Sequence, residues 1–360
     1  MRPSPIRAIA APAVALLLVA STLWLFASRR PASPVPASTS GSDAGDAWLS
    51  VYLTDPSGPQ ADSLRGGPDA RLGEAIDAAR YSVDVAIYHL NLWSVRDALL
   101  RAAERGVRVR LVVESDGIFD PEVQDLIQAG IPVLGDRREP LMHHKFTVID
   151  EIEVWTGSMN YSVGSAYRDN NVLLRIRDRA VAENYRREFD EMFNDDLFGP
   201  LSAADTPHPR VVIGTVTVET YFAPEDGVAR RLIELIAGAR SEVDVLAFTF
   251  TSDPLTEALL EAAGRGINVR GVFERDQAEA AGSDVRRLQQ AGLDVRLDNS
   301  QGTLHHKLLL IDGRVVATGS YNFTRGAEQA NDENLVILDD PEAAARLKAE
   351  FQRLYDAASR

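Results

Sequence analysis

The sequence predicts an α/β protein of two homologous halves, each a mixed β-sheet flanked by helices, packed together as a pseudo-twofold pair. Residues 71–116 align with residues 231–276 at a constant offset of 160, without a gap and with 21 identities in 46 positions. Strand-like and helical segments alternate in both copies, which is typical of sheets covered by helices. A decapeptide at 141–150 also returns almost unchanged at 303–312. A repeat of about 150 residues is too long for a solenoid, so the copies should pack as a pair.

The elements of each half follow one order. A helix (71–80; 231–240) precedes an apolar strand (83–88; 243–248), a helix that ends at Arg-Gly, and a second strand (107–113; 267–273). A short helix before Ala-Gly, a strand with His and Lys, and a strand ending at Gly-Ser complete the half. Prolines interrupt the chain between Gly199 and Arg210. The predicted division is therefore an N-terminal anchor or signal peptide (1–29), a tether (30–47), a first half (48–199) and a second half (211–360).

The composition is that of a globular protein with a real core. Of 360 residues, 45% are apolar and 25% are charged. The 53 acidic and 38 basic residues give a net charge of −15, which argues against a broad electrostatic grip on nucleic acid or anionic lipid. The absence of cysteine excludes disulfide bonds, thiol catalysis and cysteine-ligated zinc.

The N-terminal segment is the most apolar part of the chain. The 21 residues from Ala8 to Ser28 carry no charge, and arginines flank them on both sides. This length suffices to cross a bilayer, and it exceeds the apolar region of an ordinary signal peptide. We expect an uncleaved membrane anchor, with a cleaved signal peptide as the alternative. Either one predicts a body outside the cytoplasm, membrane-anchored or secreted.

The twin decapeptides belong to a longer pattern that contains candidate catalytic residues. On a strand, His143 and Lys145 project to one side while His144 projects to the other, and the second copy repeats this arrangement at His305 and Lys307. An aspartate follows five residues after each lysine, and Gly-Ser-x-Asn follows each aspartate at a fixed distance. The complete pattern, H-x-K-x4-D-x6-G-S-x-N, occurs twice, which makes coincidence negligible.

This pattern resembles the phospholipase D superfamily of phosphodiesterases, and with the repeat the resemblance covers nearly everything after the tether. It implies that one histidine attacks phosphorus and forms a phosphohistidine, while the other protonates the leaving oxygen and then activates water. By analogy with single-chain members, His143 is the expected nucleophile and His305 the expected acid. The two lysines, Lys145 and Lys307, would neutralise the phosphate oxygens. Further substrate contacts are expected from Ser158, Asn160, Ser320 and Asn322.

The resemblance also implies helper residues around the histidines. We expect Asp150 and Asp312 to complete the catalytic motifs as structural parts of the site, through backbone amides or the partner motif. Family members commonly place a carboxylate beside each histidine, and Glu333 fills that position in the second half. The first half departs from the pattern, since Asn170 aligns with Glu333 and Asp169 precedes it; which of the two contacts a histidine stays open. No metal or other cofactor is expected.

Other candidates have weaker support. His144 and His306 are expected to pack on the opposite strand face, and His89 and His208 have no assigned role. The aligned carboxylates form either an acid-base pair or helix caps and salt bridges, with the latter favoured; they are Glu114, Asp116, Glu274 and Asp276.

The leading functional hypothesis is a phospholipase D that hydrolyses phospholipids. A nuclease or cardiolipin hydrolase of the same superfamily is the alternative, although net acidity counts against duplex binding. A cardiolipin synthase-like transferase ranks third, and a catalytically dead phosphate-binding module is the remaining possibility. Both motifs lie in one chain, so we expect a monomer whose partners are a phosphodiester substrate and, through residues 1–29, a membrane.

Overall fold

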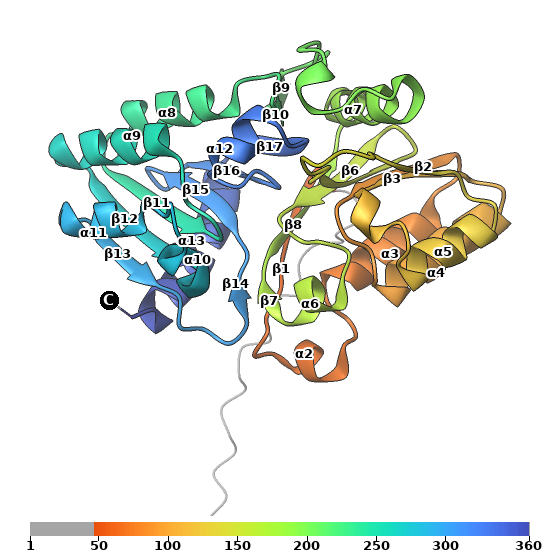
Figure 1. Cartoon of the computed structure of the whole chain (residues 1–360), viewed down its shortest axis with the longest axis horizontal. Helices are drawn as coiled ribbons and strands as arrows, with labels where there is room; N and C mark the ends of the chain where they lie inside the picture. The colour runs from red at the N-terminus through yellow and green to blue at the C-terminus, as the bar shows by residue number, and fades with distance from the viewer. Residues whose placement is uncertain (1–46, 360) are drawn as a thin grey trace, which may run out of the picture. The chain divides into compact units, whose positions relative to one another are not determined.

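Two mixed β-sheets dominate the computed structural model, which describes residues 47–359 (Figure 1). In the first sheet, β2, β3 and β4 run parallel, and β5 joins them antiparallel and continues into antiparallel neighbours. Its strands, in spatial order, are β1 (Leu49–Leu53), β8 (Val172–Arg177), β6 (Glu153–Gly157), β5 (Lys145–Ile149), β2 (Ser82–Ile87), β3 (Arg108–Val113) and β4 (Val133–Gly135).

The second sheet repeats this arrangement. The parallel strands again lie at one edge, and the strand that begins at Lys307 pairs antiparallel with them. Its order is β13 (Asp294–Leu297), β12 (Asn268–Phe273), β11 (Glu242–Ala247), β15 (Lys307–Ile311), β16 (Val315–Gly319), β17 (Glu333–Asp339), β10 (Val216–Ala223) and β9 (Arg210–Ile213). The predicted fold class, two similar mixed sheets flanked by helices, is confirmed.

Helices cover both faces of each sheet, which explains why the central strands are apolar at nearly every position. The outer face of the first sheet packs on α3 (Pro68–Ala78), α4 (Trp93–Glu104) and α5 (Pro121–Gln128), as Figure 1 shows. The outer face of the second packs on α8 (Val228–Gly238), α9 (Asp253–Gly264) and α11 (Val285–Gln290). A central core contains residues of both sheets and of two long helices, α7 (Arg179–Asp195) and α13 (Pro341–Ala357). The shorter helices are α2 (Pro59–Ser63), α6 (Val163–Tyr167), α10 (Arg275–Glu279) and α12 (Arg325–Gln329).

The helices that follow the motifs begin at matching N-caps. The Asp178 side chain accepts hydrogen bonds from the first backbone amides of α7, and Asp340 does the same for α13. Ser162 caps α6, and Thr324 caps α12 in the second half. Such caps satisfy amides that have no partner within the helix, so short polar residues fix where each helix starts.

Short backbone pairings join the two halves next to the histidine motifs. The two-residue strand β14 (Thr303–Leu304) pairs in parallel with β7 (Asp169–Asn170). In the other direction, Met142 forms a parallel bridge with Asp332. The residues just before each motif histidine therefore pair with the other half of the molecule.

The predicted elements lie close to the observed ones. The strands predicted at 83–88 and 243–248 match β2 and β11 within one residue. The strands of the first sheet lie between residues 49 and 177 and those of the second between 210 and 339; the division at 199 and 211 stays a prediction. The expected anchor or signal peptide (1–29) and nearly all of the tether fall outside the described residues. Within residues 47–359, no helix is both long enough and apolar enough to cross a bilayer.

The glycine of each Gly-Ser pair is required by the neighbouring strand. A Cβ on Gly319 would lie 2.2 Å from the carbonyl oxygen of Asn334, and one on Gly157 would lie 2.2 Å from that of Val172. Both obstacles are backbone atoms, so β16 and β17 would have to separate. We expect Gly319→Ala to lower the free energy of unfolding by about 2–4 kcal/mol, measured by urea denaturation.

Gly264, at the end of α9, is the matched control for this substitution. A Cβ added there would meet no atom within 4 Å beyond its own stretch of helix, and the backbone of Gly264 is helical. Gly264→Ala should be neutral or stabilising by up to ~1 kcal/mol. Equal losses in the two variants would contradict the steric explanation.

Candidate active site

The backbone of each motif histidine is held by the other half of the molecule. The His143 amide donates to the carbonyl oxygen of Asp332 at 2.9 Å, and the His305 amide donates to that of Asn170 at 3.0 Å. Both histidines lie just before their strands, because β5 begins at Lys145 and β15 at Lys307. The observed strands therefore begin later than predicted, because the residues before them pair with the other half of the molecule.

The His143 ring is oriented by a carboxylate from the second half. Its Nδ1 lies 2.8 and 2.9 Å from the two carboxylate oxygens of Glu333, the first residue of β17. Burial raises the pKa of Glu333 to about 7, against the opposing charge of Lys145. In its ionised form the carboxylate only accepts hydrogen bonds, so Nδ1 then carries the proton and Nε2 is left for chemistry. Glu333 therefore lies where the sequence predicted a histidine-orienting residue, but it orients the histidine of the opposite half.

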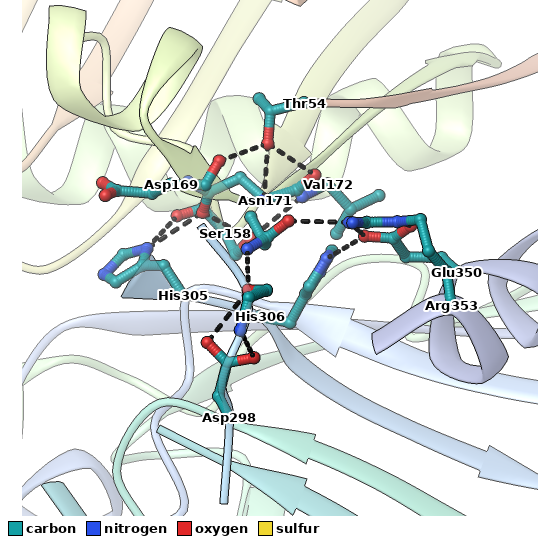
Figure 2. Close-up of polar contacts among 12 residues, drawn as sticks. Thr54, Ser158, Asp169, Asn171, Val172, Asp298, His305, His306, Glu350 and Arg353 are labelled. Atoms are coloured by element: carbon teal, nitrogen blue, oxygen red, sulfur yellow. Dashed lines mark hydrogen bonds and ion pairs between the residues drawn. The ribbon is translucent and has the colours of Figure 1, made fainter. Parts of the chain in front are cut away.

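The His305 ring is oriented by an amide. Its Nδ1 lies 2.9 Å from Oδ1 of Asn171 and 3.1 Å from the carbonyl oxygen of Ser158 (Figure 2). Asn171 was not among the predicted site residues. The alignment that paired Asn170 with Glu333 was wrong by one residue. The amides of Ser158 and Ser320 donate to the carbonyl oxygens of Val172 and Asn334, so Asn171 and Glu333 hold equivalent positions, and each bonds the histidine of the opposite half.

The orienting role expected of Asp169 or Asn170 is corrected by this geometry. The Asn170 side chain donates to Oγ of Ser300 at 2.9 Å and accepts from Arg353 at 2.7 Å. The Asp169 carboxylate bonds Thr303, and burial raises its pKa. Both residues belong to β7, whose pairing with β14 turns their side chains to other partners.

The two lysines lie beside the histidines of their own motifs. Nζ of Lys145 donates to the carbonyl oxygen of His143 at 2.7 Å, and Nζ of Lys307 donates to that of His305 at 2.9 Å. Both side chains are fully buried. Burial lowers the pKa of Lys145 to about 7, against the opposing charge of Glu333, and lowers the pKa of Lys307 well below its ordinary value.

An aromatic ring completes each motif. The Tyr88 ring lies 4.8 Å from the His143 ring and beneath Lys145 at 5.1 Å. Phe248 takes the equivalent place, 4.8 Å from the His305 ring and 4.8 Å from Lys307. These flat rings restrict where the imidazoles can lie. From the sequence, residues 88 and 248 were predicted only as the last positions of two apolar strands.

The two motifs act on each other electrostatically. Burial lowers the pKa of both His143 and His305 well below the ordinary value, and the charges of Lys145 and Lys307 lower it further at each ring. Each imidazole also lies against the Gly-Ser turn of the other half, His305 at Ser158 and His143 at Ser320. A site that gathers four basic groups is suited to bind an anion.

The motif aspartates lie away from the histidines and act on the backbone. Asp150 accepts hydrogen bonds from the amides of residues 80–82, and Asp312 accepts from the amides of residues 240–242 and from the Ser241 hydroxyl. Each aspartate follows the far end of its motif strand, which ties that end to the start of β2 or β11. The two aspartates are therefore not catalytic residues. They have the structural role that the sequence suggested, in which they bind backbone amides.

The Gly-Ser-x-Asn residues divide into two groups. The Ser158 hydroxyl donates to Asn171 and accepts from the amide of Val172, and the Ser320 hydroxyl accepts from the amide of Asn334. These hydroxyls connect adjacent segments, so direct substrate contact by the serines stays a prediction. The Oδ1 atoms of Asn160 and Asn322 are buried and have no hydrogen-bond partner among the described residues, and substrate contact by these asparagines stays a prediction.

Two glutamates position the motifs in a way that the sequence did not predict. Glu114 accepts from the amide of Met142 at 2.8 Å, and Glu274 accepts from the amide of Leu304 at 2.7 Å. Each therefore holds the residue just before a motif histidine. Burial and the nearby Asp136 raise the pKa of Glu114 to about 7. Both glutamates also stand at the N-terminal ends of short helices, as the favoured expectation had it, but their contact with the segment before each motif histidine was not predicted.

The second histidine of each pair lies on the opposite side, as expected, but also has a polar partner. His144 contacts Glu188 of α7 at 2.9 Å, and His306 contacts Glu350 of α13 at 3.2 Å. Within residues 47–359, no group of three or more His, Cys, Asp or Glu side chains is placed to hold a metal ion.

An anion should raise the pKa of both motif histidines. Burial and neighbouring positive charge lower the pKa of each ring, and a bound anion would supply a negative charge that favours protonation. We expect NMR titration to place both pKa values well below about 6.5 in the free protein and to move both upward with saturating inorganic phosphate. His208, which is exposed, should not respond. Two histidines that titrate normally and ignore phosphate would contradict a shared anion site.

Comparison with known proteins agrees with this architecture. A family model described as "Cardiolipin synthase, PLD-like domain" matches residues 72–193 and again residues 232–355. The phosphatidylserine synthase of Haemophilus influenzae has a similar fold, with a TM-score of 0.65 over 85% of this chain and 86% of that chain, at 13% identity.

Curated relatives match a length close to one half. Mitochondrial cardiolipin hydrolase of Chlamydomonas reinhardtii is 38% identical over 126 residues, 35% of this chain and 56% of that protein. Phospholipase D of Rickettsia bellii is 30% identical over 158 residues, 42% of this chain and 79% of that protein. The chain thus spans little more than half the length of the Chlamydomonas relative. The two family-model matches together span most of the sequence, and the chain belongs to the phospholipase D superfamily.

Proposed function

We propose that this chain is a phospholipase D-like phosphodiesterase that hydrolyses phospholipids through a phosphohistidine. The observation that carries the proposal is the pair of imidazoles, His143 and His305, each with Nδ1 held by the opposite half and both under the charge of two buried lysines. A phosphodiester is an anion that needs a nucleophile on one side and an acid on the other. This arrangement supplies both.

The first step forms the covalent intermediate. Nε2 of His143 attacks phosphorus, and the bond from phosphorus to the leaving oxygen breaks as His305 transfers its Nε2 proton to that oxygen. Glu333 stabilises the positive charge that develops on the His143 ring, which favours His143 as the nucleophile. Lys145 and Lys307 stabilise negative charge on the non-bridging oxygens.

The second step returns the enzyme to its initial state. His305, now neutral, takes a proton from water as the water oxygen attacks phosphorus. The phosphorus–nitrogen bond breaks, and the phosphomonoester leaves. The net change is one phosphodiester and one water converted to one phosphomonoester and one alcohol. Asn160 and Asn322 are proposed to donate hydrogen bonds from their side-chain NH2 groups to the phosphate oxygens of the substrate.

Substrate class and location are part of the same proposal. The names of the relatives support a phospholipid, with cardiolipin as a specific alternative. A nuclease remains the second candidate, and the net charge of −15 counts against it. The uncharged run from Ala8 to Ser28 supports a membrane-tethered enzyme with its body outside the cytoplasm.

Replacing either motif histidine should abolish diester hydrolysis. With bis-p-nitrophenyl phosphate as substrate, we expect His143→Asn and His305→Asn each to lower kcat on the order of 1,000-fold or more. His143→Asn removes the nucleophile, and His305→Asn removes the base that activates water in the second step. His208→Asn changes an exposed histidine that pairs with Glu183, and it should keep wild-type activity. Full activity in either motif variant would reject the shared-site mechanism.

A substrate panel should identify the class of diester. The full chain is incubated with phosphatidylcholine vesicles, with cardiolipin vesicles, and with single- and double-stranded DNA, with the His143→Asn variant as control. We expect release of phosphatidate from phospholipid. Cleavage of cardiolipin alone would identify a cardiolipin hydrolase, and cleavage of DNA without lipid hydrolysis would reject the phospholipase assignment.

A further inference from the structure

The two motif histidines differ in the chemistry of their partners. Nδ1 of His143 faces the carboxylate of Glu333, whereas Nδ1 of His305 faces the neutral amide of Asn171. The rest of the two motifs is closely matched: each histidine has a lysine two residues later and an aromatic ring 4.8 Å away. The difference therefore lies in the residue behind the ring.

The hydrogen-bond network fixes which end of the Asn171 amide faces His305. Its Nδ2 donates to the carbonyl oxygen of Ser165 at 3.0 Å, so Oδ1 is the end that meets the ring. The Ser158 hydroxyl accepts from the amide of Val172 and donates to the same Oδ1 at 2.8 Å. The second neighbour of His305 Nδ1, the carbonyl oxygen of Ser158, is also an acceptor. Nδ1 must therefore carry a proton, and Nε2 faces the site.

Asn171 itself is held rigidly. Its backbone amide donates to Oγ1 of Thr54 at 2.7 Å, and Thr54 is anchored in turn on the carbonyl oxygen of Asp169 at 2.6 Å (Figure 2). The side chain is fully buried. A buried amide with every contact satisfied keeps its orientation, so it can hold a ring in place.

The preceding residue, Asn170, belongs to a different network. Asn170 bonds Ser300 and Arg353. Arg353 also bonds Glu350 (Figure 2). Although burial opposes ionisation, hydrogen bonds from His306 and Arg353 lower the pKa of Glu350 to about 2. The charge of Arg353 is thus matched by Glu350, and the amide of Asn170 is directed to this pair instead of to His305.

We propose that Asn171 is a positioning residue that assigns His305 to proton transfer, while Glu333 assigns His143 to covalent attack. This proposal rests on the proposed phosphodiesterase reaction. An amide oxygen fixes the ring with Nε2 toward the leaving oxygen but stabilises an imidazolium less than a carboxylate does. His305 therefore gives its proton to the leaving oxygen readily and is neutral when water must be activated. A carboxylate is placed instead where the ring becomes positively charged by bonding phosphorus.

The surroundings of His305 agree with this role. The groups that act on it are Lys307 of its own strand, Lys145 of β5, and His143, and all three oppose a second positive charge. Phe248 covers one side of the ring and brings no charge. The bound substrate anion is then the group that favours protonation of His305 before the reaction.

The test compares two leaving groups. A diester with a p-nitrophenolate leaving group departs without protonation, whereas one with an alkyl alcohol leaving group needs the acid. For Asn171→Ala we expect kcat/KM to fall on the order of 100-fold for the alkyl diester and only a few fold for the p-nitrophenyl diester. The value of kcat/KM is used because it reports the steps up to departure of the first product. Asn334→Ala removes a buried amide that contacts His144 instead of a motif histidine, and it should leave the ratio between the substrates unchanged.

Two further variants separate positioning from folding. Asn171→Asp keeps the acceptor and places a negative charge by His305, so the alkyl diester should still be cleaved and the basic limb of its pH profile should move to higher pH. Glu333→Gln should lower kcat/KM for both diesters by similar factors, because attack by His143 precedes both departures.

Each outcome has a separate meaning. A wild-type protein that cleaves neither diester rejects the proposed function itself. Two results would leave the function standing and overturn the assignment of Asn171. One is that Asn171→Ala lowers kcat/KM equally for both diesters. The other is that Glu333→Gln, instead of Asn171→Ala, lowers kcat/KM more for the alkyl diester than for the p-nitrophenyl diester. An Asn171→Asp profile identical to wild type would also overturn it.

Discussion

The site depends on an exchange of hydrogen bonds between the halves. Each motif histidine takes its backbone partner and its ring partner from the opposite half, through Asp332 and Glu333 on one side and Asn170 and Asn171 on the other. Neither half holds its own histidine in a defined tautomer. A backbone pairing fixes position and a side chain fixes orientation, so a small shift between the halves would disturb both. This explains why a large central core, made of both sheets with α7 and α13, lies directly behind the site.

A second constraint is the burial of positive charge. Two lysines and two histidines lie close together with Glu333 beside them, and burial lowers the pKa of all four bases. Such a site is costly without an anion and becomes favourable with one. The cost is tolerated because the lysines are anchored on carbonyl oxygens and lie over aromatic rings. Binding energy from a phosphodiester can therefore be used to bring the bases into their charged forms when the reaction begins.

The fold class and the motif residues could be predicted from the sequence, because both depend on residues at short, fixed spacings along the chain. The motif residues lie on or beside short strands of constant length. Gly319 ends one of these strands, where the carbonyl oxygen of Asn334 leaves no room for a Cβ. The spacing from histidine to glycine is therefore fixed by the strands themselves.

Asn171 and Glu114 were missed for different reasons. The repeat alignment was displaced by one position at Asn171, and Glu114 bonds the backbone of Met142, which leaves no mark in the sequence. Whether Asn170 or Asn171 meets His305 depends on the pairing of β7 with β14, a contact between residues more than 100 positions apart. The expected membrane segment lies outside the described residues and stays a prediction.

Duplication gives two equal sites, and the reaction needs unequal ones. The structure keeps the symmetry where both halves do the same work, as in the lysines, the N-caps and the glutamates that hold Met142 and Leu304. Symmetry is lost behind the rings. Glu350 is paired with Arg353, whereas burial and the nearby Asp332 raise the pKa of Glu188, its counterpart on α7, well above its ordinary value. At the equivalent positions behind the rings, the amide of Asn171 faces His305 and the carboxylate of Glu333 faces His143, which separates proton transfer from covalent attack.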